Sequence, residues 1–198
     1  MKKIDKDKKF LIVGLGLLGG CYAMALKKKG YYVSAITKEQ DDIEYALGQG
    51  LIDRGSTTVD RELIENADII VFALYPHTFV EWIKEYGELI KEGTMLTDVT
   101  GVKGCIVYEI QSLLKPGVEF IAAHPMAGRE VSGVRNSDDS IFHEANYIVV
   151  PTDKNTFGAI ETCKELGEIL GFAQVSVLNP EKHDEMIAFL SQLTHCIA

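Results

Sequence analysis

The sequence predicts an α/β fold in which a doubly wound, mostly parallel sheet carries helices on both faces. Strand-like and helix-like segments alternate along most of the 198 residues, and the run 69–75 is apolar without polar alternation. Alternating segments give parallel strands joined by right-handed crossovers, and an uninterrupted apolar run is typical of a strand covered on both faces. A glycine-rich turn after the first strand is the third indication. Ligands bind such sheets beyond the carboxyl ends of the strands, so residues that follow strands are the functional candidates.

The first half of the chain gives these elements in a regular order. The first strand is expected at 10–13, and the helix after the glycine turn ends with the basic residues 27–29 and a stop at Gly30. Further strands are expected at 32–36, 69–75, 94–98 and 119–123, with helices at 43–47, from Pro76 onward and at 103–114. This order is βαβ throughout and supports the parallel sheet.

The second half starts with a polar loop at 125–144, which is long enough to be functional. A strand at 147–150, a helix at 156–170 and a strand at 173–178 follow it. The last helix begins with Asn179 as N-cap and Pro180 in its first position. Its apolar stripe, Met186, Leu190, Leu193 and Ile197, must pack on something. We therefore expect a nucleotide-binding domain at 1–178, and at 179–198 the first helix of an α-helical domain that is mostly missing.

Composition and charge exclude several classes of protein. Lys and Arg number 20 against 29 Asp and Glu, and the net charge of −9 argues against a nucleic-acid partner. The longest apolar run falls far short of the roughly 20 residues that cross a bilayer, so no membrane span is expected. The cysteines form no C-x-x-C pair and have no histidine doublet, so no metal site is predicted. We expect all of them, Cys21, Cys105, Cys163 and Cys196, to be buried reduced thiols in a cytoplasmic protein.

The turn Gly14-Leu15-Gly16-Leu17-Leu18-Gly19 matches G-x-G-x-x-G between a strand and a helix. The first glycine of this motif permits a tight turn, the second allows a pyrophosphate to approach the backbone, and the third allows close helix–strand packing. The helix N-terminus adds free N–H groups and a partial positive charge. The motif predicts a Rossmann-type dinucleotide site, and a purely structural glycine turn is the alternative.

The end of the second strand bears on the type of cofactor. Thr37 and Lys38 stand where an acid would hold the ribose hydroxyls of NAD, and a hydroxyl with an ammonium suits the 2'-phosphate of NADP. We therefore favour NADP. NAD remains the alternative if the strand ends later and Glu39 becomes the ribose ligand, and Lys38 can also be read as a solvated residue at a helix start.

A histidine loop, His124-Pro125-Met126-Ala127-Gly128, follows the strand expected at 119–123. A histidine at the ligand-binding edge can accept a proton from a substrate hydroxyl while hydride leaves the same carbon. The segment 97–104, which ends the neighbouring strand, brings hydroxyl, carboxylate and ammonium groups to the same edge. These neighbours favour catalysis over a histidine that merely ends a strand.

Taken together, several motifs resemble the prephenate dehydrogenase family, which includes arogenate dehydrogenases. They are the glycine turn, Tyr75-Pro76-His77-Thr78, the segment Thr97-Asp98 to Lys103-Gly104, the histidine loop with Glu130 and Gly133, and Ser191-Gln192-Leu193-Thr194-His195. The resemblance implies an NAD(P)-binding domain followed by a helical domain that forms a homodimer. It further implies a cytoplasmic enzyme of tyrosine biosynthesis that converts prephenate to 4-hydroxyphenylpyruvate by oxidative decarboxylation.

The resemblance also assigns roles to residues. His124 matches the catalytic histidine. Family members often have a serine before Val-Lys-Gly that supports this histidine, whereas this chain has Thr100-Gly101, so Thr100 is the candidate for the supporting hydroxyl. The remaining candidates are His195, Ser191, Gln192, Arg129 and Glu130 for the substrate, and Leu74, Tyr75, Pro76 and Thr78 beside the nicotinamide.

Other readings of the chain stay open at this point. His77, His143 and His183 are expected to be structural or solvent-facing, with His183 on an exposed helix start. The alternative functions are an arogenate dehydrogenase, a dinucleotide-sensing domain without catalysis, and a more distant hydroxyacid dehydrogenase. The last would be expected to use a catalytic lysine in place of the histidine loop.

Overall fold

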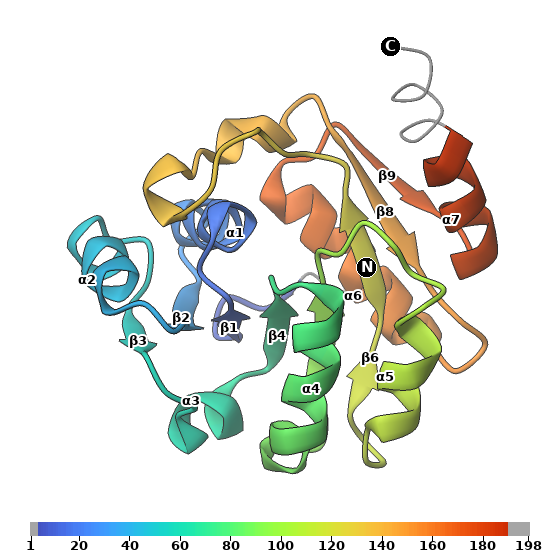
Figure 1. Ribbon diagram of the computed structural model, residues 1–198, viewed down its shortest axis with the longest axis horizontal. Helices are drawn as coiled ribbons and strands as arrows, with labels where there is room; N and C mark the ends of the chain where they lie inside the picture. The colour runs from blue at the N-terminus through green and yellow to red at the C-terminus, as the bar shows by residue number, and fades with distance from the viewer. Residues whose placement is uncertain (1–3, 190–198) are drawn as a thin grey trace.

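A six-stranded parallel sheet organises the first part of the chain, and the computed structural model describes residues 4–189 (Figure 1). The strands lie in the order β3-β2-β1-β4-β5-β6, so the chain first moves outward from β1 on one side and then returns to its other side. Their bounds are β1 (Lys9–Val13), β2 (Tyr32–Ile36), β3 (Arg54–Ser56), β4 (Ile69–Phe72), β5 (Met95–Asp98) and β6 (Glu119–Phe120). The doubly wound fold is confirmed, and its switch point lies between β1 and β4.

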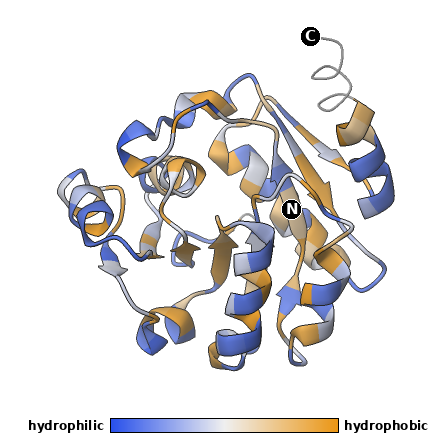
Figure 2. Ribbon diagram, in the orientation of Figure 1, coloured by the Kyte–Doolittle hydropathy of each residue, from blue (hydrophilic) through white to orange (hydrophobic). Residues whose placement is uncertain are grey.

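Helices cover both faces of this sheet, as Figure 1 shows for α1 on one side and α4 on the other. The helices are α1 (Leu17–Lys28), α2 (Gln40–Gly48), α3 (Arg61–Asn66), α4 (Pro76–Tyr86), α5 (Val107–Leu113), α6 (Phe157–Leu170) and α7 (Pro180–Ile187). Phe10 and Ile12 of β1 enter the core beneath α1, α2 and α6, while Leu11 and Val13 enter the core beneath α3, α4 and α5. Successive side chains of a strand point to opposite faces, so a strand between two cores is apolar throughout. Figure 2 shows this as hydrophobic strands inside helices with hydrophilic outer faces.

A second sheet of three strands holds the segment that was expected to be a single strand at 119–123. It has the order β7-β8-β9, with β7 (Ala122–Pro125), β8 (Asn146–Val150) and β9 (Gln174–Val177). Ile121 still donates its N–H to the carbonyl of Leu96 on β5, but from Ala122 onward the chain pairs antiparallel with β8. The prediction of one continuous strand was therefore wrong, because both pieces are buried and nothing in their side chains marks the change of partner. His124 lies inside β7, opposite Ile148.

Other element bounds also differ from the sequence expectation. The strand expected at 69–75 ends at Phe72, and the helix expected at 103–114 begins only at Val107. The residues removed from these elements, 73–75 and 103–106, belong to the turns beyond β4 and β5. They therefore lie at the edge where ligands bind such a sheet.

The long loop at 125–144 folds against the start of α1. It contains two short 3₁₀ helices, η2 (Val134–Asn136) and η3 (Asp139–Phe142), and a third such helix, η1 (Gly87–Leu89), follows α4. The Ser137 hydroxyl donates to the carbonyl of Leu17 at 3.1 Å. A Cβ at Gly20 would lie 2.0 Å from that hydroxyl oxygen, so this packing needs a glycine just after the glycine turn.

Helix α7 begins as expected, since the Asn179 side chain accepts the N–H of Lys182 and Pro180 takes the first position. Met186 packs against the core under α4 and α5. The rest of the predicted stripe, Leu190, Leu193 and Ile197, lies outside the described residues, and the domain boundary at 178 stays a prediction. No helix in the stretch from 4 to 189 is long and apolar enough to span a membrane.

Of the cysteines, Cys21 and Cys163 are buried, but Cys105 is exposed, so the expectation of uniform burial was wrong. Cys105 lies in the turn after β5 and not in a regular element, which removes the packing that would cover it. Cys196 lies outside the described residues.

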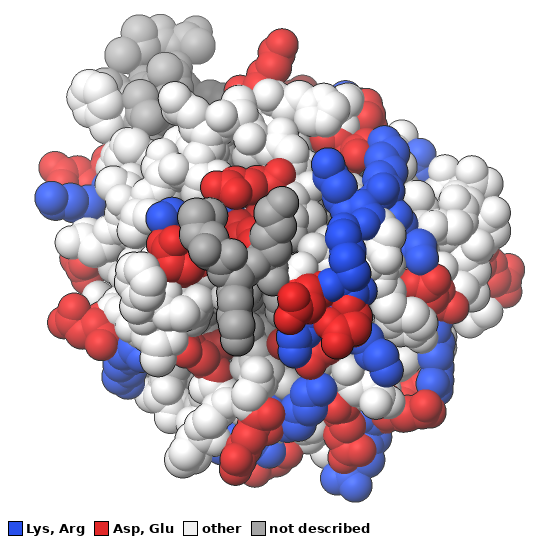
Figure 3. All heavy atoms as spheres, turned by 180° about the vertical axis from the view of Figure 1, so that it is seen from behind, with Lys and Arg blue, Asp and Glu red and all other residues white. Residues whose placement is uncertain are grey.

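The net charge is spread over neighbouring charges of both signs. On the face opposite that of Figure 1, basic side chains gather in a band bordered by acidic ones (Figure 3). Basic side chains form ion pairs with acidic neighbours, such as Lys27–Asp53 at 2.6 Å and Lys28–Asp139 at 2.6 Å.

Candidate active site and nucleotide-binding turn

The glycine turn joins β1 to α1 at the switch point of the sheet. Gly14 has φ +95°, and a Cβ on it would lie 2.4 Å from the carbonyl oxygen of Ala73. A Cβ on Gly19 would lie 2.0 Å from the carbonyl oxygen of Gly14. These two glycines are therefore required by the protein's own packing.

Gly16 differs from the other two glycines of the motif. It is exposed at the N-cap of α1, and a Cβ on it would have nothing within 4 Å. The space it leaves is thus open for a ligand to approach the backbone. The first turn of α1 carries no acidic residue, so the positive end of the helix is not neutralised there. The turn fits the pyrophosphate of a dinucleotide.

The leucines of the motif contribute to the turn in two ways. Leu15 is buried in the core, so only its backbone can face a ligand. Leu17 and Leu18 are partly buried and pack against the same core. These apolar side chains hold the start of α1 against the sheet.

The residues that follow β2 and β4 lie on the same edge. β2 ends at Ile36 as predicted, and Thr37 then donates its N–H to Ser56 at 3.1 Å while Lys38 is exposed. Glu39, the alternative ribose ligand, is the N-cap residue of α2. The predicted nicotinamide neighbours come directly after β4. Leu74 reaches the side of Gly14, Tyr75 is 85% exposed, and Pro76 and Thr78 lie in the first turn of α4.

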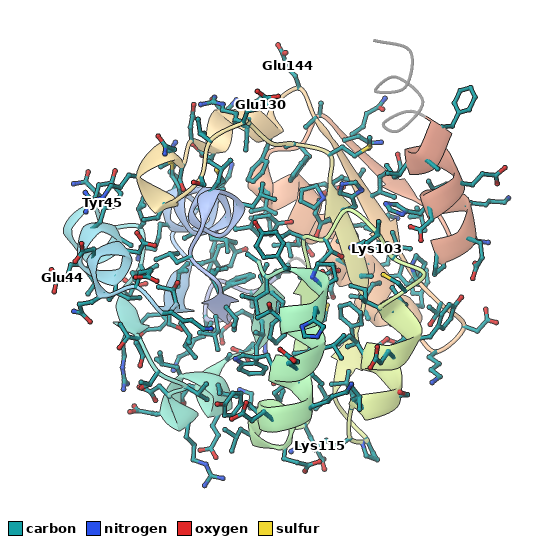
Figure 4. The ribbon with its side chains drawn as sticks, in the orientation of Figure 1. Glu44, Tyr45, Lys103, Lys115, Glu130 and Glu144 are labelled. Atoms are coloured by element: carbon teal, nitrogen blue, oxygen red, sulfur yellow. The ribbon has the colours of Figure 1, made fainter. Side chains whose placement is uncertain are left out.

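A fully buried ion pair lies behind the end of β5. Lys103 Nζ is 2.7 Å from Asp98 Oδ2 and 2.6 Å from the carbonyl oxygen of Ala123. Asp98 Oδ1 accepts the N–H of Ala123 at 3.1 Å. The pair therefore holds β7 by both backbone groups of the residue before His124. Burial lowers the pKa of Lys103 although Asp98 opposes the shift. Figure 4 shows Lys103 among the strand ends, beside the turn that leads to α5.

Thr100 belongs to this ion pair. Its hydroxyl contacts Asp98 Oδ2, the carbonyl oxygen of Val102 at 3.0 Å and Lys103 Nζ at 3.2 Å. Within the described chain, His124 is not among its hydrogen-bond partners. Gly101 is the residue beside the imidazole, since a Cβ on it would lie 3.7 Å from His124 Nε2.

His124 forms a hydrogen-bonded row with two residues of α7. His124 Nδ1 is 2.9 Å from His183 Nε2, and His183 Nδ1 is 2.7 Å from Asp184 Oδ1. His183 is fully buried, so the expectation that it lies on an exposed helix start was wrong. Asp184 accepts the N–H of Lys103 at 2.9 Å and that of Gly104 at 2.7 Å, which ties α7 to the turn after β5.

The electrostatics of the row favour neutral imidazoles. Burial, together with the charge of Lys103 and the neighbouring His183, lowers the pKa of His124 from 6.5 to about 4. Burial also lowers the pKa of His183, although the hydrogen bond to Asp184 opposes this. His124 is therefore a neutral base at physiological pH. The signal that could have found His183 was its place directly before Asp184 at the start of a capped helix, but only packing shows which way it points.

The predicted substrate residues are only partly within the described chain. Arg129 Nη2 is 2.8 Å from Asp138 Oδ2 in the same loop, and both side chains are nearly half exposed. Hydrogen bonds from Ser140 and the ion pair with Arg129 lower the pKa of Asp138 to about 2. Figure 4 shows Glu130 on the outer side of the loop, away from Lys103. Ser191, Gln192 and His195 lie outside the described residues.

The fold and this edge of the sheet together define a nucleotide-binding α/β domain of the kind found in oxidoreductases. A family model described as the nucleotide-binding domain of prephenate dehydrogenase matches residues 22–176. The chain belongs to the prephenate dehydrogenase family.

Individual relatives agree with this assignment. The chain is 32% identical over 197 residues to a prephenate dehydrogenase of Lactococcus lactis, covering 96% of this chain and 52% of that protein. A prephenate dehydrogenase structure from A. aeolicus, in complex with hydroxyphenyl propionate and NAD+, is 30% identical with a TM-score of 0.88, and covers 98% of this chain and 68% of that one. A structure of an arogenate dehydrogenase from Synechocystis is 26% identical with a TM-score of 0.86, and the match covers 93% of this chain and 64% of that one. The chain spans about half the length of the curated relatives it matches.

Proposed function

We propose that this chain is the cofactor-binding and catalytic half of an NAD(P)-dependent prephenate dehydrogenase of tyrosine biosynthesis. The observation that carries the proposal is the position of His124, a neutral imidazole at the edge of the sheet that also holds the open glycine turn. A dinucleotide-sensing domain would need the turn but not the buried machinery around His124. A dehydrogenase needs both.

In this reaction His124 acts as the base. Nε2 takes the proton of the hydroxyl on the substrate ring, while hydride leaves the carbon that carries that hydroxyl. The bound cofactor supplies the acceptor for the hydride. The ring carboxylate departs as carbon dioxide and its bonding electrons make the ring aromatic. The proton held on His124 returns to the phenolate oxygen, so no proton is consumed overall.

The buried pair behind β7 has a positioning task in this proposal. Lys103 and Asp98 form hydrogen bonds with the carbonyl and the N–H of Ala123. They therefore fix the position of His124, the next residue, at the edge of the sheet. Thr100 completes the pair through its hydroxyl. We therefore assign to Thr100 the support of the Asp98–Lys103 pair. It was expected to contact His124 directly, but in this proposal it acts on His124 only through that pair.

Substrate binding is assigned to the residues that the family resemblance indicates. Arg129 and Glu130 lie in the loop after β7, and Ser191, Gln192 and His195 come after the described residues in the sequence. Arg129 is held by Asp138 and would present a positive charge to a dianionic substrate from that place. A cytoplasmic location and dimerisation through the helical domain accompany this proposal.

NADP is the proposed cofactor, with NAD as the alternative. The support is that β2 ends at Ile36, so that Thr37 and Lys38 come first after the strand. Titration of the chain with each oxidised cofactor tests this choice, and tighter binding of NAD would overturn it.

Arogenate is the second candidate substrate, favoured by the structural similarity to an arogenate dehydrogenase. The near-ultraviolet absorbance of the reduced cofactor separates the candidates when prephenate and arogenate are each supplied to a chain that includes the helical domain. Changing His124→Asn in that chain should lower turnover about 10²-fold or more and leave cofactor affinity nearly unchanged. Near-normal turnover of the variant would remove His124 from the reaction.

A further inference from the structure

Two segments far apart in the sequence meet behind the candidate base. His124 comes from β7, while His183 and Asp184 come from the first turns of α7. The three side chains are joined in one row by contacts of 2.9 Å and 2.7 Å. His183 is fully buried, so water does not compete for either of its ring nitrogens.

The far end of this row fixes which atoms carry protons. Asp184 accepts the backbone N–H groups of Lys103 and Gly104, one on each oxygen. Although burial opposes ionisation, the hydrogen bonds from His183 and from these two amides lower the pKa of Asp184, so its carboxylate is an acceptor only. His183 Nδ1 must therefore carry a proton in order to contact Asp184 Oδ1.

The proton on His183 Nδ1 determines the next position. A neutral imidazole has one donor and one acceptor nitrogen, so His183 Nε2 is the acceptor. His124 Nδ1 must then carry a proton to donate to it, which leaves His124 Nε2 as a free acceptor. That nitrogen lies on the side of Gly101, where no Cβ crowds it.

Burial and the charge of Lys103 keep both rings neutral, although the carboxylates of Asp98 and Asp184 oppose this. Asp98 faces them from the end of β5, Lys103 from the turn after β5, and Asp184 from α7. If His183 were protonated, it would donate from both nitrogens, and His124 would have to accept through Nδ1 and carry its proton on Nε2. That tautomer could not take a proton from a substrate. Burial and the ammonium of Lys103 both disfavour it.

We propose that His183, anchored by Asp184, is a positioning residue that holds His124 in the Nδ1–H tautomer with Nε2 free at the substrate side. This inference rests on the proposed role of His124 as base and adds the group that makes the base competent. It assigns to His183 the supporting role that Thr100 was expected to play, since the Thr100 hydroxyl is engaged by Asp98 and Lys103.

A direct test determines the tautomers in the unsubstituted protein. The chain is labelled with ¹⁵N-histidine, and multiple-bond proton–nitrogen spectra are recorded at neutral pH, with His124→Gln used to assign the signals. We expect a protonated Nδ1 and an unprotonated Nε2 for His124, and the same tautomer for His183. A His124 ring protonated on Nε2 would overturn the proposal.

A matched pair of variants tests the link between the two histidines. His183→Gln can place an amide oxygen near the former Nε2 and still accept from His124, whereas His183→Asn ends near the former Nδ1 and cannot reach it. We expect His183→Asn to shift the His124 signals toward a mixture of tautomers and to lower turnover about 10-fold or more, with His183→Gln closer to wild type. Cofactor affinity should stay unchanged in both variants, which serves as the check on folding.

The outcomes separate this inference from the proposed function. Equal His124 spectra and equal turnover in both variants and in wild type would overturn the positioning role. A shifted His124 tautomer in His183→Asn, together with normal turnover of His124→Asn, would support the positioning of His124 by His183 and refute the proposed role of His124 as the base. Loss of turnover in His124→Asn with no response to His183→Asn would sustain the reaction and refute the positioning role.

Discussion

The glycine turn and the histidine row occupy the same edge of the molecule but are built in opposite ways. The turn is one contiguous stretch, and two of its glycines are required by backbone atoms of the turn itself and of the residue after β4. The row joins the turn after β5, β7 and α7, and the contact between Gly104 and Asp184 spans 80 residues of sequence. The first site is therefore encoded locally, whereas the second exists only once the chain has folded. Substitutions should separate the two sites accordingly.

The largest effect is expected from Lys103→Met, which breaks the support of the histidine row. It would leave the fully buried Asp98 without its partner and release the carbonyl of Ala123. Removing one member of a buried pair costs about 3–5 kcal/mol, because the remaining charge is uncompensated. Urea denaturation followed by circular dichroism measures the loss. The exposed Lys154→Met is the control and should change the free energy of unfolding by less than about 0.5 kcal/mol. A similar small loss in both variants would contradict the structural role of the pair.

The glycine turn offers the next contrast, between two positions of one motif. Gly19→Ala places a Cβ against the carbonyl oxygen of Gly14, a backbone atom that cannot swing aside, and should destabilise the protein by about 2–4 kcal/mol. Gly16→Ala meets only open space and should cost less than about 1 kcal/mol. Thermal unfolding without ligand ranks the two variants, and equal melting temperatures would show that the clash at Gly19 is relieved by movement of α1.

The same contrast explains what the sequence could and could not predict. Alternating segments and a contiguous motif predict the doubly wound sheet, the turn and the cap at Asn179, because those features depend on neighbours in sequence. The break between β6 and β7 was not predictable, since apolar residues suit either sheet. His183 was misjudged because its neighbours are polar, and helical spacing does not reveal which face of a capped first turn meets another element. The role of the Thr100 hydroxyl was likewise set by the fold of the turn after β5 and not by its place in the motif.

The third prediction separates binding from chemistry. Gly16→Val puts a branched side chain into the open space above the N-terminus of α1 and should abolish dinucleotide binding, since a pyrophosphate could no longer approach the backbone. The histidine row should be unaffected, so the His124 ring signals of this variant should match those of wild type. Calorimetric titration with each oxidised cofactor provides the measurement. Undiminished binding would mean that the turn is structural only.

A pH series tests the histidine row alone. The pKa of His124 is lowered from 6.5 to about 4 by burial and by the charges of Lys103 and His183. Between these two values the unfolded chain binds a proton at His124 and the folded chain does not. The free energy of unfolding is therefore undiminished by this group above pH 6.5 and falls as the pH drops toward 4. The loss should be of the order of 3 kcal/mol by about pH 4, and the lowered pKa of His183 adds to it in the same direction.

The control for this series is His124→Asn, which removes one of the two titrating rings. Its stability should fall less steeply over the same range, while the carboxylates whose pKa values are lowered, among them Asp184 and Asp138, contribute equally to both proteins. Parallel curves for wild type and variant would show that His124 titrates normally and is not buried as described.

The smallest effect concerns the outer part of the nucleotide site. Lys38 is exposed after β2, so its attraction for a 2'-phosphate acts through water and is worth about 1 kcal/mol. Lys38→Ala should therefore weaken NADP+ binding about 5-fold and leave NAD+ binding unchanged, with the exposed Lys29→Ala at the far end of α1 as the control. Added salt should shrink the difference, because exposed charges are screened. An equal loss of affinity for both cofactors would place Lys38 near the pyrophosphate that they share. No loss of affinity for either would mean that Lys38 does not select the cofactor, and Thr37 or Glu39 would then be the candidates.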